Sequence, residues 1–458
     1  MLNVPDTPLA RGARLITDRL QAAGHQAVWA GGCVRDLLAG LDPKDFDIAT
    51  AARPEAVQAL FPRSKAVGKA FGVILVSIGG NDYHVATFRK DLAYADGRRP
   101  EGVLFADARE DAERRDFTMN ALFFDPASRR ILDYVNGQSD LAAGLVRCVG
   151  DPGERFAEDY LRMIRAVRFA AALDFRIDPG TADAIRTHSS KLAQTAAERI
   201  QAELTRTLLE AVHPGDALVL MHDLGILKAI LPEVEAMAGQ AQPPLFHPEG
   251  DVLTHTVLML NAMRDRSLRL AYSALLHDVG KPPTAMNDGA RIRFNNHASV
   301  GAEMARLMLR RLKFKADDID AVCHVISNHM RFMMVRNMRR ATLIRMTSAP
   351  TFPVELEMHK LDCLASHGDL SNYEFLTRFM EERASEPALP KPWVTGRDLM
   401  AAGIAEGKRI GEWKHKAYEL QLEGAFANRE EALEWLNAEI KKGLPPPGAA
   451  GDAPCPAP

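Results

Sequence analysis

Short apolar runs separated by turns fill the first part of the chain, and longer helical patterns fill the rest. The expected strands are residues 26–30, 46–49, 73–78 and 83–89. Gly79-Gly80-Asn81-Asp82 separates the last two and is typical of a hairpin turn, while residues 33–39 carry a helical pattern. From about Pro152 onward strand signals vanish and helical periodicity takes over. The pattern predicts an α+β protein, with a mixed α/β head followed by all-α regions.

Proline-rich segments divide the helical part of the chain. They are Gln242-Pro243-Pro244 and residues 387–392. The end of the chain is rich in Pro, Gly and Ala, so we expect it to be disordered. The predicted domains are a head (1–137), a helical neck (138–240), a third domain (245–375), a helical tail (385–443) and a disordered end (444–458).

The composition bounds the class of protein without naming a function. A chain of 458 residues is too long for one compact core. The net charge of −3 carries no overall basic signature, so any RNA site must be a local basic patch. The five cysteines are scattered and form no CxxC pair, which argues against a disulfide framework and a cysteine zinc site. No signal pattern and no apolar run of about 20 residues is found, so we expect a cytoplasmic protein without membrane contact.

A Gly-Gly turn joins the first expected strand to the first expected helix, in Ala30-Gly31-Gly32-Cys33-Val34-Arg35-Asp36. Glycines let the backbone approach a phosphate closely, and a helix N-terminus offers free N–H groups to it. Arg35 could add a charge-assisted contact. Such turns also occur for packing alone, so both interpretations stay open at this point.

Asp45-Phe46-Asp47 follows the turn. Residues two apart in a strand point to the same face, so both carboxylates could hold one or two magnesium ions. Two such ions activate an attacking hydroxyl and neutralise a leaving pyrophosphate. A solvated turn is the alternative for an isolated Asp-x-Asp, and the Gly-Gly turn upstream favours the metal.

Two further motifs carry paired charges. Arg114 and Arg115 suit a triphosphate, and Asp116 could accept a hydrogen bond from a ribose 2′-OH. The alternative is a charged helix start, because Asp and Asn are good caps. Asp159 and Arg162 lie three apart, so the spacing predicts that they share a helix face, either as an ion pair or as a reader of a base.

A fixed acceptor and donor would discriminate between bases. Cytosine and adenine each offer an amino donor beside a ring-nitrogen acceptor, whereas uracil and guanine present the opposite polarity. Asp159 could accept from the amino group and Arg162 could donate to the ring nitrogen. A buried unpaired polar group costs about 1–3 kcal/mol, so one such pair could select C and A over U and G.

Together these motifs resemble those of the class II CCA-adding tRNA nucleotidyltransferases and the related bacterial poly(A) polymerases, within the DNA polymerase beta-like superfamily. The resemblance covers residues 25–235 and includes a fifth motif, Ala197-Glu198-Arg199-Ile200 with Glu203-Leu204. It implies that Asp45 and Asp47 bind catalytic magnesium ions. The residues that it implies for nucleotide binding are Gly31, Gly32, Arg35, Arg114, Arg115, Asp116, Asn120, Asp159, Arg162, Arg165 and Arg168.

The resemblance also implies separate roles within this set. Gly32, Arg35, Arg115, Arg165 and Arg168 would hold the triphosphate, Asp116 the ribose, and Asp159 with Arg162 the base. Asp96, Gly97 and Arg98, in the segment 96–100, resemble a flexible loop that helps the site switch from CTP to ATP. One departure is His84, where the family often carries an acidic residue: it either alters the metal site or is a solvated strand histidine.

A second constellation of histidines and aspartates lies in residues 245–370. The segment 271–276 is predicted to be a buried helix that leads to His277-Asp278 and ends at Gly280-Lys281-Pro282. A polar pair there needs partners such as a metal, and imidazole with carboxylate suits manganese, iron, nickel or zinc. The pattern resembles the HD phosphohydrolase superfamily. This implies His255, His277, Asp278 and Asp362 as core ligands, with His297 and His329 where some members bind a second metal.

The resulting hypothesis is template-independent addition of C, C and A to the 3′ end of tRNA from CTP and ATP. Some HD-containing relatives have phosphatase or 2′,3′-cyclic phosphodiesterase activity, which would suit repair of RNA 3′ ends; an idle HD domain that packs or binds tRNA is the alternative. Lys408, Arg409, Lys414 and Lys416 of the tail could contact tRNA phosphates.

Three rival functions stay open. The first is CC-addition, A-addition or poly(A) synthesis by the same head. The second, of a different class, is a metal-dependent HD phosphohydrolase with a non-catalytic RNA-binding head. The third is a nucleotide-sensing regulatory protein. The sequence does not give the oligomeric state.

Overall fold

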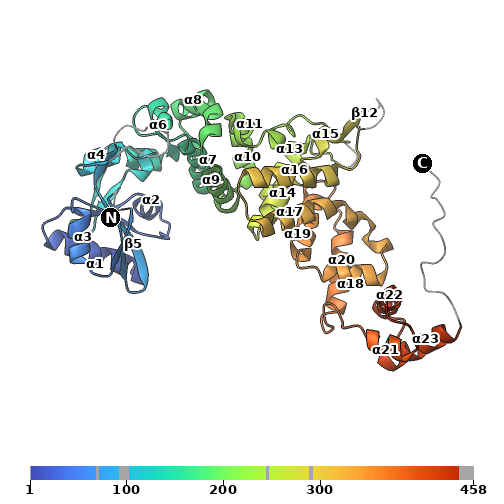
Figure 1. Ribbon diagram of the computed structural model, residues 1–458. Helices are drawn as coiled ribbons and strands as arrows, with labels where there is room; N and C mark the ends of the chain where they lie inside the picture. The colour runs from blue at the N-terminus through green and yellow to red at the C-terminus, as the bar shows by residue number, and fades with distance from the viewer. Residues whose placement is uncertain (1, 69–71, 92–102, 244–246, 288–291, 443–458) are drawn as a thin grey trace. The chain divides into compact units, whose positions relative to one another are not determined.

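The structure is a computed structural model that describes residues 2–68, 72–91, 103–243, 247–287 and 292–442. The chain divides into two compact units, residues 1–323 and 324–458 (Figure 1). The loop predicted at Asp96, Gly97 and Arg98 and the disordered end predicted at 444–458 lie outside the described residues.

The head of the first unit is built on one mixed sheet of seven strands, in the order β3-β4-β5-β2-β1-β8-β9. These strands are β1 (Ala27–Ala30), β2 (Asp47–Thr50), β3 (Ser64–Gly68), β4 (Val73–Ile78), β5 (Asn81–Thr87), β8 (Phe123–Asp125) and β9 (Arg130–Leu132). β1 runs antiparallel to β2 and β8, and β2 runs parallel to β5. β4 and β5 form the predicted hairpin, in which Gly79 and Gly80 both take positive φ.

Both faces of this sheet are covered. On one face lie α1 (Pro8–Ala22), α2 (Gly32–Leu38) and α3 (Pro54–Leu60), around a core that includes Trp29. Figure 1 shows α1 and α3 on the same side of the head. The other face carries α4 (Ala108–Glu113) and a core that includes Val28. Successive residues of a strand point to opposite faces. All residues of β1 are buried, whereas β5 keeps Asp82 and His84 exposed beside its buried residues.

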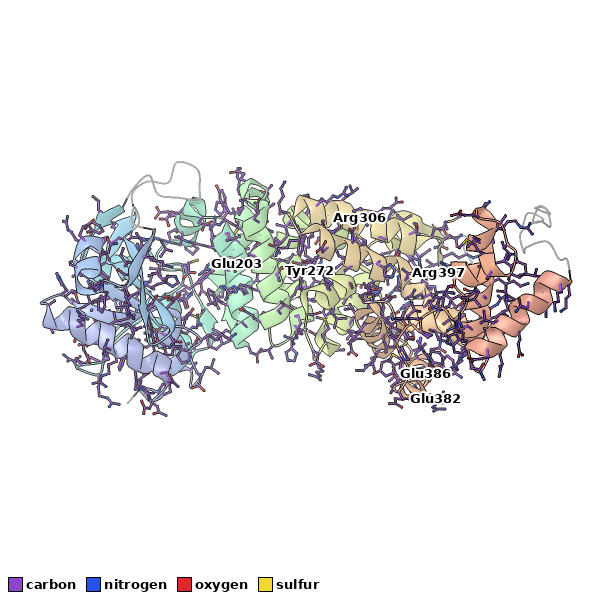
Figure 2. All side chains as sticks on the ribbon, turned by 60° about the horizontal axis from the view of Figure 1, so that its bottom comes forward. Glu203, Tyr272, Arg306, Glu382, Glu386 and Arg397 are labelled. Atoms are coloured by element: carbon purple, nitrogen blue, oxygen red, sulfur yellow. The ribbon has the colours of Figure 1, made fainter. Side chains whose placement is uncertain are left out.

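The neck is a set of helices that follows the head. Their bounds are α5 (Gly137–Ala142), α6 (Pro152–Glu158), α7 (Leu161–Leu173), α8 (Pro179–His188), η3 (Ser189–Gln194), α9 (Ala197–Glu210), α10 (Pro214–Asp223), α11 (Ile226–Ile230) and α12 (Pro232–Glu235). α7 packs against both α9 and α10. Tyr272 of the third domain shares a hydrogen bond of 3.0 Å with Thr205 of α9, and Figure 2 labels Tyr272 beside the neck residue Glu203.

Strands do not vanish after Pro152, so that prediction is wrong in detail. β10 (Leu145–Val146) pairs with β11 (Arg176–Ile177), and β12 (Ala285–Asn287) pairs with β13 (Ile292–Phe294). Elements of two or three residues are too short to show a period-two pattern, which is why the sequence did not reveal them. β6 (Arg89–Asp91) and β7 (Val103–Phe105) form a further small pair in the head.

The third domain begins with helices of the first unit. They are α13 (Val252–Ala262), α14 (Leu268–Leu276), α15 (Lys281–Thr284), α16 (His297–Arg311) and α17 (Ala316–Asn328). The buried helix before His277 is confirmed as α14. It already ends at Leu276, however, and Gly280-Lys281-Pro282 begins α15 rather than ending α14. Proline is well tolerated in the first turn of a helix, which explains the difference.

The second unit is helical and has two apolar cores. Its elements are η4 (His329–Asn337), α18 (Arg340–Thr347), α19 (Phe352–Ala365), α20 (Ser371–Glu382), α21 (Gly396–Ala401), α22 (Lys408–Glu423) and α23 (Arg429–Lys441). Phe332 and Phe352 lie in one core, and Trp413 and Leu436 lie in the other. Within the described residues, no helix of either unit is both long and apolar enough to cross a membrane.

Candidate functional site

The Gly-Gly turn between β1 and α2 requires a glycine at its first position. Gly31 has φ of 71°, and a Cβ added there would lie 3.0 Å from Nη1 of Arg115. Its backbone N–H donates to the carbonyl oxygen of Leu122 at 3.1 Å. A residue with positive φ disfavours a side chain, and here the added Cβ would also contact the guanidinium of Arg115. The turn therefore brings the backbone of Gly31 against Arg115.

The carboxylates of Asp45 and Asp47 lie beside this turn at the start of β2. Because β2 begins at Asp47, Asp45 precedes the strand, and the expected alternation along a strand does not apply to the pair. Burial and then the charge of Asp47 raise the pKa of Asp45. His84 of β5 places its Nδ1 3.4 Å from Oδ1 of Asp47. This hydrogen bond to Asp47 is the main cause that raises the pKa of His84, against the effect of burial.

This donor set fits a divalent cation. The charge of Asp47 raises the pKa of Asp45, and a cation that lies between the two carboxylates offsets this repulsion. Among the described residues, Asp45, Asp47 and His84 do not bring three ligand atoms within 4.8 Å of one another. An ion shared by all three therefore requires Asp45, which lies outside the strand, to move toward the other two.

Arg114 and Arg115 share a buried carboxylate that the sequence analysis missed. Asp111 accepts from Arg114 at 2.7 Å and from Arg115 at 3.0 Å, and it is 1% exposed. Burial would raise the pKa of Asp111, but the charges of Arg115 and Arg114 outweigh it and lower the pKa. The spacings of three and four residues within α4 were the available signal. Asp111 thus holds both guanidinium groups, with that of Arg115 next to the Gly31 turn and that of Arg114 on the carbonyl oxygen of Arg89.

A continuous chain of hydrogen bonds links the turn to the neck. Arg35 donates to Oδ1 of Asn120 at 2.7 Å, and Asn120 donates to Asp116 at 3.1 Å. Arg165 of α7 donates to the other oxygen of Asp116 at 2.6 Å. Burial would raise the pKa of Asp116, but the charge and hydrogen bond of Arg165 lower it to about 2. Four of the predicted nucleotide-binding residues therefore form one polar network.

Asp159 and Arg162 do not share a helix face, so that prediction is wrong. α6 ends at Glu158 and α7 begins at Leu161, and Asp159 between them is extended, with φ of −154°. Asp159 pairs with Arg199 at 2.7 Å, whereas Arg162 pairs with Glu158 at 2.6 Å. The spacing argument assumed one continuous helix, and the break at Asp159 removes that assumption.

Glu203 of the fifth motif forms ion pairs with Arg165 and Arg168 of α7. It accepts from Arg168 at 2.6 Å and lies 3.4 Å from Arg165, and Figure 2 labels it in the neck. Arg168 is only 3% exposed, and its guanidinium lies 4.0 Å from the centroid of the Phe169 ring. In this structure Arg168 fastens α7 to α9, and its predicted contact with a triphosphate stays untested.

The second candidate site gathers buried side chains in the third domain. His255, His277 and Asp278 bring ligand atoms within 4.8 Å of one another, and each is at most 1% exposed. His277 lies 3.0 Å from Asp278 through Nε2, and His297 lies 3.6 Å from the other oxygen of Asp278. Buried imidazoles around a carboxylate fit a transition metal.

Hydrogen bonds on the outer ring nitrogens orient these histidines. Nδ1 of His277 lies 2.9 Å from the carbonyl oxygen of Ala274, and Nδ1 of His297 lies 2.8 Å from that of Phe294. A carbonyl oxygen only accepts, so Nδ1 carries the proton and Nε2 is left as a ligand atom. The backbone of the domain therefore fixes the tautomer that a metal needs.

Three residues of this site were not assigned from the sequence. Glu249 lies 2.7 Å from Nδ1 of His255 and 2.9 Å from Nδ1 of His247. Burial would raise the pKa of Glu249, but its hydrogen bond with His255 lowers it to about 2. Lys281 donates to Asp278 at 2.7 Å and is 5% exposed. Lys281 had been noted only as part of a helix-ending segment.

The remaining predicted residues belong to the second unit. His329 begins η4 and Asp362 lies in α19, and their roles as metal ligands stay predictions. Among the tail cations, Lys416 pairs with Glu439 at 3.1 Å. Lys408 and Lys416 line a hollow of about 680 Å³ with Arg339. Glu412 and Glu419 line the same hollow, so its charges are mixed, and the contact of the tail with tRNA phosphates stays a prediction.

Three family descriptions match successive parts of the chain. Residues 27–147 match the Poly A polymerase head domain. Residues 174–237 match the probable RNA and SrmB-binding site of polymerase A, and residues 251–365 match the HD domain. These segments correspond to the head, the neck and the third domain described above.

Known relatives are similar over different lengths of the chain. The CCA-adding enzyme of Limosilactobacillus fermentum is 43% identical over 210 residues, which are 45% of this chain and 52% of that relative. The chain thus spans about half the length of the curated relatives that it matches. The crystal structure of the Bacillus stearothermophilus CCA-adding enzyme in complex with CTP covers 96% of this chain and 100% of its own, with a TM-score of 0.73 and 26% identity.

A third relative shares the fold at a lower identity. The Thermotoga maritima CCA-adding enzyme complexed with tRNA covers 96% of this chain and 97% of its own, with a TM-score of 0.61 and 19% identity. The order of head, neck and HD domain, the motifs that they carry and these similarities agree. The chain therefore carries a Poly A polymerase head domain, the RNA-binding region of polymerase A and an HD domain in this order, and it is similar to CCA-adding enzymes over most of its length.

Proposed function

We propose that this protein adds C, C and A to the 3′ end of tRNA, using CTP and ATP. The observation that carries the proposal is the arrangement of Asp45 and Asp47 beside the Gly31 turn, which is held against Arg115. Its support is the similarity, over 96% of the chain, to a CCA-adding enzyme solved in complex with CTP. CC-addition, A-addition and poly(A) synthesis are rival outcomes of the same chemistry.

Each group of the head has a distinct task in this proposal. Asp45 and Asp47 hold magnesium, which when bound activates the 3′-hydroxyl of the RNA and neutralises the leaving pyrophosphate. Arg115, held by Asp111, binds the triphosphate together with Arg35. Because both guanidinium groups are already fixed by hydrogen bonds, they lose little freedom when the nucleotide binds.

The base is selected in the neck. Asp159 accepts from the exocyclic amino group and Arg162 donates to the ring nitrogen of C or A. The two lie on either side of a helix break, and each has its own partner: Arg199 for Asp159 and Glu158 for Arg162. We infer that these partners position the acceptor and the donor independently. Asp116, held by Arg165, accepts from the ribose 2′-OH.

The test is incorporation into a tRNA transcript that lacks its last three nucleotides. CTP, ATP, UTP and GTP are supplied singly and together, with Asp45→Ala/Asp47→Ala as the control. Growth by C, C and A followed by arrest, lost in the double variant, supports the proposal. Arrest after CC, addition of a lone A, or a long A tail identifies one of the rivals. No incorporation by the unaltered protein overturns it.

We propose a second activity for the HD domain, the metal-dependent hydrolysis of phosphate esters at RNA 3′ ends. The supporting observation is the buried group His255, His277 and Asp278, oriented through outer hydrogen bonds. Manganese, nickel, iron and zinc suit these ligands, and a bound metal would activate water. The assay uses tRNA ending in a 2′,3′-cyclic phosphate or a 3′-phosphate, with each metal added separately. An idle domain predicts no hydrolysis with any of them.

A further inference from the structure

The geometry points to His84 as a ligand of the catalytic ion in the head, so that this site pairs an imidazole with carboxylates and favours Mn²⁺ over Mg²⁺. The inference rests on the proposed function, because it concerns the ion that nucleotide addition uses. It assigns a role in metal selectivity to His84, whose Nδ1 lies beside the carboxylate of Asp47.

The strand pairing places His84 and Asp47 on one face. β2 and β5 run parallel with Ile48 opposite Val85, so the preceding residues, Asp47 and His84, are also neighbours. Ile48 and Val85 are fully buried in the core on the α1 side of the sheet. Since side chains alternate along a strand, Asp47 and His84 both point away from that core. The register of the sheet, and not a flexible loop, therefore brings these two side chains together.

The distance between their nearest atoms suits two ligands of one ion. Nδ1 of His84 lies 3.4 Å from Oδ1 of Asp47. Adjacent ligands of an octahedral ion with bonds of about 2.1 Å lie about 3 Å apart. Their side chains are 58% and 51% exposed, so an ion can reach them from solvent. A change of a few tenths of an ångström would allow both atoms to bind the same ion.

The identity of the ligand decides the preference for the ion. Mg²⁺ is bound in proteins through oxygen ligands, especially charged carboxylates. Mn²⁺ is a transition-metal ion and accepts an imidazole nitrogen more readily than Mg²⁺ does. A histidine in place of a carboxylate removes one negative charge from the site. The lost charge weakens the binding of both divalent ions alike, whereas the change from an oxygen to a nitrogen ligand weakens Mg²⁺ binding relative to Mn²⁺. The alternative is that His84 is a protonated countercharge of Asp47, displaced when the ion binds.

The experiment tests whether an imidazole nitrogen is bound to the ion, in the full-length protein loaded with Mn²⁺ alone. Pulsed electron paramagnetic resonance detects the ¹⁴N nucleus of an imidazole bound to Mn²⁺. The HD histidines also contribute nitrogen, so the head signal is defined as the part that Asp45→Ala/Asp47→Ala removes. His84→Gln is expected to lose this same part while it keeps the Mn²⁺ stoichiometry of the unaltered protein. An unchanged nitrogen signal in His84→Gln overturns the inference and favours the countercharge.

Selectivity provides a second, independent measurement. Mg²⁺ is titrated into the Mn²⁺-loaded protein, and the release of Mn²⁺ is followed by the signal of free Mn²⁺. Release from the head is the difference between the unaltered protein and Asp45→Ala/Asp47→Ala. His84→Glu replaces the imidazole by an oxygen ligand and is expected to raise Mg²⁺ affinity relative to Mn²⁺ severalfold, because Mg²⁺ prefers oxygen ligands more strongly than Mn²⁺ does. An unchanged ratio overturns the inference. Incorporation by the unaltered protein is scored separately, so failure of the proposed function is distinguishable from failure here.

Discussion

The head site and the HD site of this protein differ in how their polar groups are held. In the head, the side chains of Asp47 and His84 are about half exposed, and the surrounding arginines are fixed by carboxylates. In the HD domain, His255 and Asp278 are buried, and the histidines are fixed by their outer nitrogens. An open site suits substrates and ions that exchange at every turnover, whereas a buried one suits an ion that stays. Variants of the two sites test this contrast.

The largest effect is expected from removing the head carboxylates. Asp45→Ala/Asp47→Ala should lower nucleotide incorporation on the order of a thousandfold or more, because metal-ion catalysis supplies several kcal/mol of transition-state stabilisation. Single-turnover incorporation of CTP into the shortened tRNA measures it. Metal analysis of the HD domain should be unchanged in the same variant. A simultaneous loss of HD metal would contradict the independence of the two sites.

The next effect tests whether the HD site is preorganised by Glu249. Glu249→Gln removes the charge that holds Nδ1 of His255. Loss of such an outer partner lowers metal affinity by about 10- to 100-fold. Titration with Mn²⁺ or Zn²⁺ against a chelator measures the change. Asp251→Asn is the matched control, since the carboxylate of Asp251 accepts from the backbone N–H groups of Thr254 and Gly239. Asp251 also accepts from the N–H of His255 through its backbone carbonyl, which the substitution keeps. Equal affinity in both variants would rule out the orienting role.

That pair of acidic residues shows where the sequence stops being informative. In the structure Asp251 caps α13 and Glu249 binds His255. In the sequence, both are simply acidic residues that precede a helix. Which of them faces the site depends on how the chain enters the helix, and a pattern of residue types does not carry that geometry. The His277-Asp278 pair was recognisable because it follows an apolar helix, whereas His255 and His297 were expected as ligands from the resemblance to the HD superfamily.

In the head, local motifs were more predictable than long-range pairing. β1, the Gly-Gly turn and α2, which ends at Leu38, were all expected, because neighbouring residues determine them. The pairing of Asp159 with Arg199, 40 residues away, was not, since it depends on how α7 and α9 pack. The assumption that Asp159 and Arg162 share a helix failed because α6 ends at Glu158 and α7 begins only at Leu161. Short elements such as β10 leave no periodic pattern at all.

A smaller effect is expected from filling the turn at Gly31. Gly31→Ala forces a Cβ into a left-handed residue and against Arg115, so it should destabilise the protein by about 2–3 kcal/mol and raise KM for CTP. Gly24→Ala is the control: Gly24 also has positive φ, 85°, but no described atom lies within 4 Å of the added Cβ. Gly24→Ala should cost only about 1 kcal/mol and leave KM unchanged. Equal costs in urea unfolding would show that the contact with Arg115 is unimportant.

The smallest effect concerns the charge network of the head and its dependence on pH. The pKa of Asp116 falls from 3.8 to about 2 on folding, so the ionised carboxylate contributes about 2 kcal/mol of stability above pH 4. Because the folded pKa is lowered, this contribution is lost as the pH falls toward 2, and about half remains at pH 3. Asp116→Asn should therefore be less stable than the unaltered protein by about 2 kcal/mol at pH 6 and by about 1 kcal/mol at pH 3. Urea unfolding at both pH values measures the difference. A difference that does not change with pH would mean that Asp116 stabilises the head by packing and not by its charge pair with Arg165.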